Sequence, residues 1–278
     1  MGGFDPLFGF MNEMEYMSTL MYMRHPSGVP FAIPITLDVP ESIAGKISVG
    51  SCVFLLDRYS TPFAKLVIDD IFRPNKTLEA LVCYGNATDT RHPSIEYLLD
   101  ISGPVYVGGK LHAVSSYVWH FDYKPYRMSP TQLKREIQKR GSPSMVIGFQ
   151  TRNPLHASHV FLIKDALDTN PDSILILHPA VGPTKFDDIP YNVRVETYIS
   201  ALFTPGGSLS EYSSRIILSL LPLAMRFAGP RETLLHMLVR KNFGLSALII
   251  GRDHAGFAGT FPSMCVCEYR FLCTYSSV

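Results

Sequence analysis

The stretch Met145–Leu177 reads MVIGFQTRNPLHASHVFLIKDALDTNPDSILIL and decides the fold of the second half of the chain. Short apolar runs at Met145–Phe149 and Ser173–Leu177 predict two buried strands, and the apolar spacing of Pro154–Leu167 predicts a helix between them. A strand, a helix and a second strand in this order are typical of a parallel sheet covered by helices.

The alternation continues toward the C-terminus. The pattern predicts helices at Val193–Ala201 and Arg231–Asn242, and strands at Arg215–Leu220 and Ala247–Ile250. Strands that alternate with helices over more than a hundred residues favour an α/β domain.

The N-terminal part has a different composition. β-Branched and aromatic residues separated by turn signals predict short strands, as in a small barrel or sandwich; these are Ile47–Leu56, Ala64–Ile71, Leu78–Tyr84 and Val105–Ser116. The Met-rich stretch Asn12–Met23 is the exception and predicts a helix. Ser129 followed by Pro130 predicts a helix start, with the helix running to about Arg140. The domain boundary is therefore expected within residues 125–143.

Composition excludes several classes of protein. The 278 residues are 46% hydrophobic, so global disorder is excluded. Lys and Arg number 25 and Asp and Glu 24, which leaves no strong field for nucleic acid or a membrane surface. No apolar run reaches the 18 residues of a membrane span, and the N-terminus lacks the pattern of a targeting peptide. The five cysteines fit no secreted disulfide framework and no strong zinc pattern, so we expect a reducing compartment and no metal site.

A polar segment, Gln150–His159, follows the first predicted α/β strand. His156 and His159 are three residues apart and share a helix face, at a helix start where free N–H groups favour anions. Arg152 adds a planar donor fork suited to phosphate or sulfate; Gln150, Thr151 and Asn153 add neutral polar groups. The segment predicts a nucleotide or anion site at a strand end, whereas an isolated pair of histidines would more often be structural.

A second polar loop follows the last predicted strand. It reads Gly251-Arg252-Asp253-His254-Ala255-Gly256, and its glycines permit close approach of a ligand to the backbone. We expect it to form the opposite wall of the same pocket. Arg226 and Arg231 lie ahead of a helix and could either bind anions or be ordinary solvated charges.

These segments together resemble the ATP sulfurylase (sulfate adenylyltransferase) family. The marker motifs correspond to Gln150–His159 and Gly251–Gly256, and further matches are Gly2–Glu13, Ile33–Asp38, Val107–Lys110, His178–Lys185, Leu220–Glu232 and Arg240–Gly244. The resemblance runs from residue 2 to about residue 256. It implies an α/β fold in which a PUA-like β-barrel domain (1–125) and a linker helix (126–143) precede a Rossmann-like parallel nucleotidyltransferase domain of the HxxH type (144–256), with a divergent tail (257–278).

The resemblance also implies a reaction and its site. ATP and sulfate give adenosine 5′-phosphosulfate and pyrophosphate, with Mg²⁺ accompanying ATP. Thr151, Arg152, Asn153, His156 and His159 would be catalytic. The residues implied to bind ATP are Gln150, Arg152, Gly251, Arg252, Asp253 and His254, and those implied to bind sulfate are Gln150, Arg152 and the Ala255 backbone. Because sulfate needs no deprotonation at neutral pH, catalysis should rest on positioning and charge stabilisation, without a covalent intermediate.

Three departures from the family pattern lead to alternatives. The chain begins inside the N-terminal pattern, Ala157-Ser158 replaces an Arg-Ala pair, and the match ends near Gly256, so we expect a chain truncated at both ends. A catalytically impaired paralogue or isoform that binds anions or nucleotides, or acts as a scaffolding subunit, is therefore an alternative to the active enzyme. Another HxxH adenylyltransferase and RNA binding through the PUA-like domain are weaker ones. We expect no nucleic-acid or membrane partner, a cytoplasmic, stromal or matrix location, and leave homo-oligomer formation open.

Overall fold

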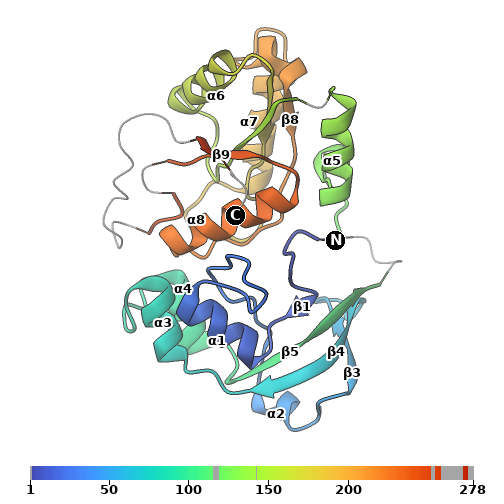
Figure 1. Cartoon of the computed structure of the whole chain (residues 1–278), viewed down its shortest axis with the longest axis vertical. Coiled ribbons are helices and arrows are strands. Elements are labelled where there is room, and N and C mark those ends of the chain that lie inside the picture. Colours follow the sequence, from blue (N-terminus) through green and yellow to red (C-terminus); the bar gives the residue numbers. More distant parts are fainter. Residues whose placement is uncertain (1, 115–118, 142, 252–253, 258–271, 275–278) are drawn as a thin grey trace.

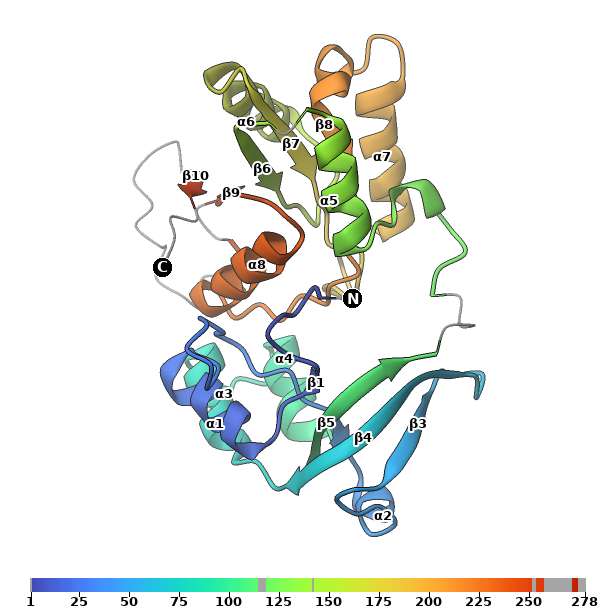
Figure 2. The ribbon, with the colours of Figure 1, turned by 45° about the vertical axis from the view of Figure 1, so that its right-hand side comes forward.

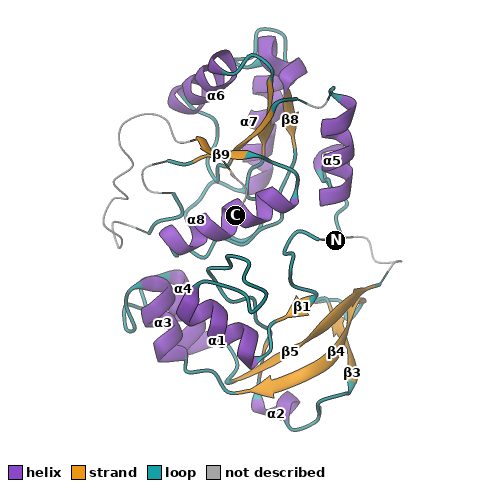
Figure 3. Ribbon diagram, in the orientation of Figure 1, coloured by secondary structure: helices purple, strands orange, loops and turns teal. Residues whose placement is uncertain are grey.

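The computed structural model describes residues 2–114, 119–141, 143–251, 254–257 and 272–274. It has two halves, each built on a five-stranded sheet (Figure 1). Figure 3 shows that each half contains both helices and strands.

The N-terminal half is built on an antiparallel sheet. Its strands are β1 (Gly9–Phe10), β2 (Asp38–Val39), β3 (Cys52–Leu56), β4 (Pro62–Phe72) and β5 (Val105–Ala113). The order is β1-β5-β4-β3, and β2 also pairs with β5. The helices of this half are α1 (Glu13–Tyr22), α2 (Glu41–Ala44), α3 (Lys76–Tyr84) and α4 (Pro93–Glu96), the last continuing into a π-helical turn at Tyr97–Ile101. The predicted helix at Asn12–Met23 is confirmed, with Asn12 as the N-cap residue.

The predicted strand at Leu78–Tyr84 is wrong, because this segment belongs to helix α3. The side chain of Asn75 accepts a hydrogen bond from the Leu78 amide, and Gly85 closes the helix in the left-handed conformation. Ala80, Cys83 and Tyr84 are buried at helical spacing. Two good caps and one buried face outweigh the β propensity of the individual residues.

The second half is a three-layer α/β arrangement. Its sheet contains β6 (Met145–Phe149), β7 (Ser173–Leu177), β8 (Ile216–Leu218), β9 (Ala247–Ile249) and β10 (Leu272–Thr274). The strand order is β10-β9-β6-β7-β8, and all pairs are parallel except β10 with β9. The helices are α5 (Pro130–Lys139), α6 (Ala157–Thr169), α7 (Tyr191–Phe203) and α8 (Pro230–Asn242). The parallel α/β sheet predicted from the sequence is confirmed.

Alternate residues of the parallel strands enter two different cores. Ile147 and Leu175 belong to the core that includes residues of α6 and α7. Val146 and Ile174 belong to the core that includes residues of α5 and α8, because successive side chains on a strand point to opposite faces. The sheet is therefore covered on both faces, as expected for parallel strands.

Helix α8 joins the two halves of the molecule. Figures 1 and 2 show it between the parallel sheet and the N-terminal half. The core that contains Leu235 and Val239 of α8 continues into Tyr16 and Leu20 of α1. At the end of α8, the Asn242 amide donates hydrogen bonds to the carbonyl groups of Gly3 and Asp5. No helix in the described part of the chain has the length and apolar character needed to cross a bilayer.

The strand order reverses at β6. The chain adds β7 and β8 on one side of β6 and then returns to place β9 on the other side. In open parallel sheets, ligands bind outside the carboxyl ends of the strands at such a switch point. The two loops that follow β6 and β9 begin at this edge, which makes them the candidate site.

Candidate active site

The loop after β6 is held by hydrogen bonds to its own side chains and to α7. The Thr151 hydroxyl accepts from the Asn153 amide at 3.0 Å and donates to the Asn153 carbonyl at 3.1 Å. The hydroxyl of Tyr198, a fully buried residue of α7, donates to the same carbonyl at 2.6 Å. Thr151 and Asn153 thus shape the backbone, and the Asn153 residue itself is exposed.

Helix α6 begins at Ala157, three residues later than predicted. His156 is the N-cap residue with extended backbone angles, and its carbonyl accepts the first helical hydrogen bond, from Val160. Pro154 therefore lies in the loop and not in the first turn. The bonds around Thr151 and Asn153 keep the loop out of helical geometry up to His156.

The two histidines of the loop lie against each other. Their rings stack with centroids 3.6 Å apart, and His159 also meets the ring of Phe149 edge-on. His156 is exposed, whereas His159 is half-buried. Burial and the neighbouring His156 lower the pKa of His159 to about 4. His159 is therefore neutral near pH 7, at the N-terminal end of a helix where anions are favoured.

Arg152 lies between a carboxylate and an aromatic ring. Its Nη1 forms an ion pair with Asp188, and its guanidinium carbon lies 5.3 Å from the centre of the Phe227 ring. Burial acts to raise the pKa of Asp188, but the hydrogen bond and charge of Arg152 hold it below the ordinary value. Asp188 binds one of the three guanidinium nitrogens, so the other donors of the fork can bind an anion.

The side-chain amide of Gln150 is partly buried, and its hydrogen-bonding groups have few partners. Its Nε2 makes a weak hydrogen bond to the sulfur of Met225 at 3.6 Å, and its Oε1 is buried with no hydrogen-bond partner. A buried amide in this condition favours a further polar partner. Gln150 and Arg152 come from the same loop, so the first predicted segment is brought together around the end of β6.

The loop after β9 is only partly described. Gly251 is exposed, and a Cβ atom added to it would meet no atom within 4 Å, so the fold itself does not require glycine there. Arg252 and Asp253 lie outside the described residues. Ala255 has a left-handed φ of 58°, and its carbonyl accepts a hydrogen bond from the Gly229 amide at 3.0 Å. This bond ties the loop to the start of α8.

His254 points into the protein. Its Nε2 lies 3.2 Å from Nδ1 of His236 on α8, and Nε2 of His236 lies 3.2 Å from Glu232. Burial, followed by the charges of His236 and Arg240, holds the pKa of His254 well below its ordinary value. His254 thus anchors its loop to α8 through a chain of side chains that ends at the Glu232 carboxylate.

Arg226 and Arg231 hold the two halves together. Arg231 donates to the carbonyl groups of Leu20 and Ala32 in the N-terminal half. The side chain of Arg226 is hydrogen-bonded to Tyr84, which contributes to a raised pKa against the opposing effect of burial. Both arginines therefore bind groups of the protein itself, and the alternative of ordinary solvated charges is wrong for them.

Three residues outside the predicted set, Asp188, Lys185 and Phe227, lie beside Arg152 or beside each other. Asp188 pairs with Arg152, and Nζ of Lys185 lies 5.3 Å from the centre of the Phe227 ring. Lys185 belongs to a segment that matched the family pattern, but Asp188 had no signal beyond being a carboxylate close to that lysine in the chain. Phe227 also lies in a segment that matched the family pattern, Leu220–Glu232, but nothing in the sequence singled it out.

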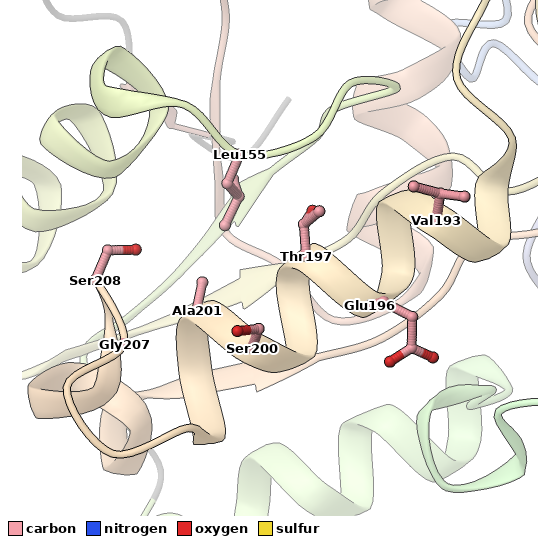
Figure 4. A pocket seen from close by; sticks show the side chains of 8 residues that line it. All are labelled: Leu155, Val193, Glu196, Thr197, Ser200, Ala201, Gly207 and Ser208. Carbon is pink, nitrogen blue, oxygen red and sulfur yellow. The ribbon is translucent and has the colours of Figure 1, made fainter.

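An open hollow of about 510 Å³ adjoins the same loop on the side of α7 (Figure 4). It is lined by Leu155, Val193, Glu196, Thr197, Ser200, Ala201, Gly207 and Ser208. The stacked histidines and Arg152 do not line it. Its walls are aliphatic and hydroxyl-bearing with one carboxylate, so it does not have the cationic lining that an anion requires.

Comparison with known proteins identifies the family of this chain. A family model described as ATP-sulfurylase matches residues 124–269, and one described as a PUA-like domain matches residues 1–116. The chain belongs to the ATP-sulfurylase family. The resemblance noted in the sequence and the combination of a PUA-like part with an α/β part are thereby confirmed.

Curated relatives cover nearly all of this chain. A sulfate adenylyltransferase of Schizosaccharomyces pombe is 46% identical over 258 residues, which is 92% of this chain and 50% of the relative. The Saccharomyces cerevisiae protein of the same name is 42% identical, over 92% of this chain and 48% of the relative. A probable bifunctional SAT/APS kinase 2 of Sorangium cellulosum is 41% identical over 94% of this chain and 44% of the relative. The chain thus spans about half the length of the relatives it matches.

A solved structure shares the fold. It is titled hexameric APS kinase from Thiobacillus denitrificans, and it superposes with a TM-score of 0.68 at 24% identity. The match covers 91% of this chain and 44% of that one. The arrangement of both halves, and not only their local structure, is therefore found in a known protein.

Proposed function

We propose that this chain catalyses the sulfate adenylyltransferase reaction. A sulfate oxygen attacks the α-phosphorus of ATP, the bond from that phosphorus to the bridging oxygen breaks, and pyrophosphate leaves as adenosine 5′-phosphosulfate forms. The observation that carries the proposal is that the segments beginning at Gln150 and at Gly251 follow two neighbouring parallel strands, β6 and β9, at the same edge of the sheet. Relatives at 40–46% identity that bear this name support it.

We assign sulfate to Gln150, Arg152 and the backbone of Ala255. The Nε2 of Gln150 is bonded only weakly, to the sulfur of Met225, so it can donate to a sulfate oxygen, and Arg152 keeps donors beyond the one bound to Asp188. Sulfate is fully ionised near pH 7, so the site requires donors and no general base. Thr151 and Asn153 position the loop through their mutual hydrogen bonds.

We assign the phosphates of ATP to His156 and His159, with Gly251, Arg252, Asp253 and His254 on the nucleotide side. A neutral His159 can donate one hydrogen bond to a phosphate oxygen, and negative charge on the bound phosphates would favour its protonation as the transition state develops. His254 acts through its loop, because its ring nitrogen faces His236.

Mg²⁺ is proposed to enter with ATP. In the described part of the chain, no set of three or more His, Cys, Asp or Glu side chains gathers into a metal site. Mg²⁺ usually binds nucleotides through phosphate oxygens and water, and we propose the same arrangement here. The ion would neutralise charge on the departing pyrophosphate.

We also propose that the protein resides in a reducing compartment. Cys52 and Cys83 are free thiols, which supports a reducing compartment such as the cytoplasm, a stroma or a matrix. The charge balance supports ATP and sulfate as partners over nucleic acid. Homo-oligomer formation can be tested by light scattering of the purified chain.

The deciding experiment is sulfate-dependent release of pyrophosphate from Mg-ATP, with pyrophosphatase to remove the product. Release that requires sulfate and disappears in Arg152→Ala would support the enzyme. A folded chain that binds Mg-ATP without turnover would overturn this proposal and favour a binding or scaffolding subunit.

A further inference from the structure

Phe227 adopts a backbone conformation that needs support. It is 1% exposed, and its φ of 56° is in the left-handed region that non-glycine residues rarely occupy. Such a conformation is strained and persists only when surrounding contacts hold it. Hydrogen bonds from two different parts of the molecule hold the backbone around Phe227.

One set of contacts comes from α8. The two carboxylate oxygens of Glu232 accept hydrogen bonds from the amides on either side of Phe227, at 2.7 Å from Arg226 and 3.1 Å from Ala228. Glu232 is fully buried. This carboxylate holds the N–H groups of the segment.

The other set comes from the N-terminal half of the molecule. The Ser94 hydroxyl donates to the Arg226 carbonyl at 2.7 Å, and Nε2 of His92 lies 3.0 Å from the Phe227 carbonyl. His92 is the N-cap residue of α4, and its Nδ1 accepts from the Ser94 amide. Because Nδ1 is an acceptor, the ring proton must be on Nε2, where it points to Phe227. Figures 1 and 2 both place α4 at the boundary with the second half.

The ring held in this way lies beside two cations. Arg152 is 5.3 Å from its centre, and Nζ of Lys185 is also 5.3 Å from its centre. Lys185 lies 4.5 Å from the ring of Phe257 as well, and that ring contacts both His92 and Phe227. These cations come from two different loops, one after β6 and one after β7. An aromatic face at this distance attracts a cation and fixes where it lies.

We propose that His92 and Ser94 are positioning residues for sulfate binding, because they hold Phe227 in the conformation that places Arg152 and, together with Phe257, Lys185. The inference rests on the proposed function and extends it to the N-terminal half. That half thereby takes part in forming the anion site without touching the substrate.

The test compares variants that remove or keep one hydrogen-bond donor. His92→Leu removes the donor to Phe227, and His92→Gln keeps an N–H group at a similar reach. Ser94→Ala and Ser94→Thr form a second matched pair. In His92→Leu and Ser94→Ala, which lose the donor, we expect the KM for sulfate to rise about tenfold, with kcat and the KM for ATP changed by less than about twofold. His92→Gln and Ser94→Thr, which keep a donor, should recover most of the sulfate affinity.

Two further measurements separate this proposal from the function it rests on. Sulfate binding by calorimetry needs no turnover, and hydrogen exchange of the peptides that contain residues 150–153 and 225–229 needs no ligand. We expect both peptides to exchange faster in His92→Leu than in His92→Gln. Equal exchange, or equal sulfate affinity in His92→Leu and the wild type, would overturn the positioning role.

If the wild type neither binds sulfate nor turns over ATP, the proposed function fails together with the sulfate role. The exchange measurement then decides whether the hydrogen bonds still couple the two loops. A His92→Leu variant that raises the KM for sulfate and the KM for ATP equally would indicate general loosening and would also overturn the proposal.

Discussion

The guanidinium of Arg152 is paired with the carboxylate of Asp188, which ties the loop after β6 to the loop after β7. Arg152 is 25% exposed and Asp188 is 10% exposed, so the pair is partly shielded from solvent. A charge pair in this setting both orients the arginine and reduces its free positive charge. In the proposed sulfate site, Asp188 would therefore set the direction of Arg152 before an anion binds.

Arg152→Ala should remove most sulfate-dependent turnover. The loss of one charged donor to a developing oxyanion typically lowers the rate by about 10²–10³-fold. Pyrophosphate release at saturating Mg-ATP measures the effect. Arg91→Ala is the matched control, because Arg91 is 87% exposed and pairs with Asp89 in the N-terminal half. Equal activity of the two variants would contradict the assignment of Arg152.

Asp188→Asn should change how stability depends on pH. Because Arg152 holds the pKa of Asp188 below the ordinary value of 3.8, the carboxylate stabilises the fold above that value. This contribution is lost as pH falls through the lower folded-state pKa. The stability difference between wild type and variant should be constant above about pH 5 and shrink below about pH 4. Urea unfolding measures it, with the exposed neighbour Asp187→Asn as control.

His159 should titrate near pH 4 in the free protein and higher with a bound anion. Its pKa is lowered from 6.5 to about 4, so the folded state binds fewer protons than the unfolded chain between these values. Stability from this residue is therefore present above pH 6.5 and is lost as pH falls toward 4. NMR titration should show the pKa rising when Mg-ATP is added, because negative charge favours the imidazolium.

The stability of His159→Gln should fall less than that of the wild type between pH 7 and pH 5. His112→Gln, at an exposed position of β5, is the control. A His159 resonance that titrates at its ordinary value, and that nucleotide does not move, would argue against a phosphate-binding role.

Tyr198→Phe should weaken the support of the loop without removing a group of the site. The variant loses the 2.6 Å hydrogen bond to the Asn153 carbonyl, which still accepts from Thr151. We expect about 1 kcal/mol less stability and a severalfold lower kcat. Tyr212→Phe, whose hydroxyl binds Asp168 at the surface, should leave kcat unchanged. An unaltered kcat in Tyr198→Phe would show that the loop does not depend on this bond.

Sequence patterns predict this structure well where the deciding interactions are between residues close together in the chain, and poorly where the residues are far apart. The helix of α5 follows from Ser129 and Pro130, because a capping box is a local signal. The strand predicted at Leu78–Tyr84 is a helix, because the caps at Asn75 and Gly85 and the burial of one helix face against the core stabilise it. The start of α6 was misplaced because the Tyr198 hydroxyl, 45 residues from Asn153 in the chain, helps to hold the loop.

The sequence by itself determined the family, the alternation of strands and helices, and the two polar segments that follow the neighbouring strands β6 and β9. These are properties of local spacing and of ordered motifs, which are visible without coordinates. Only the tertiary structure decided that Asp188 pairs with Arg152, that His254 faces His236, and that Phe227 lies beside two cations. Each of these depends on side chains brought together from distant positions by the packing of separate elements, and no local pattern encodes such a meeting.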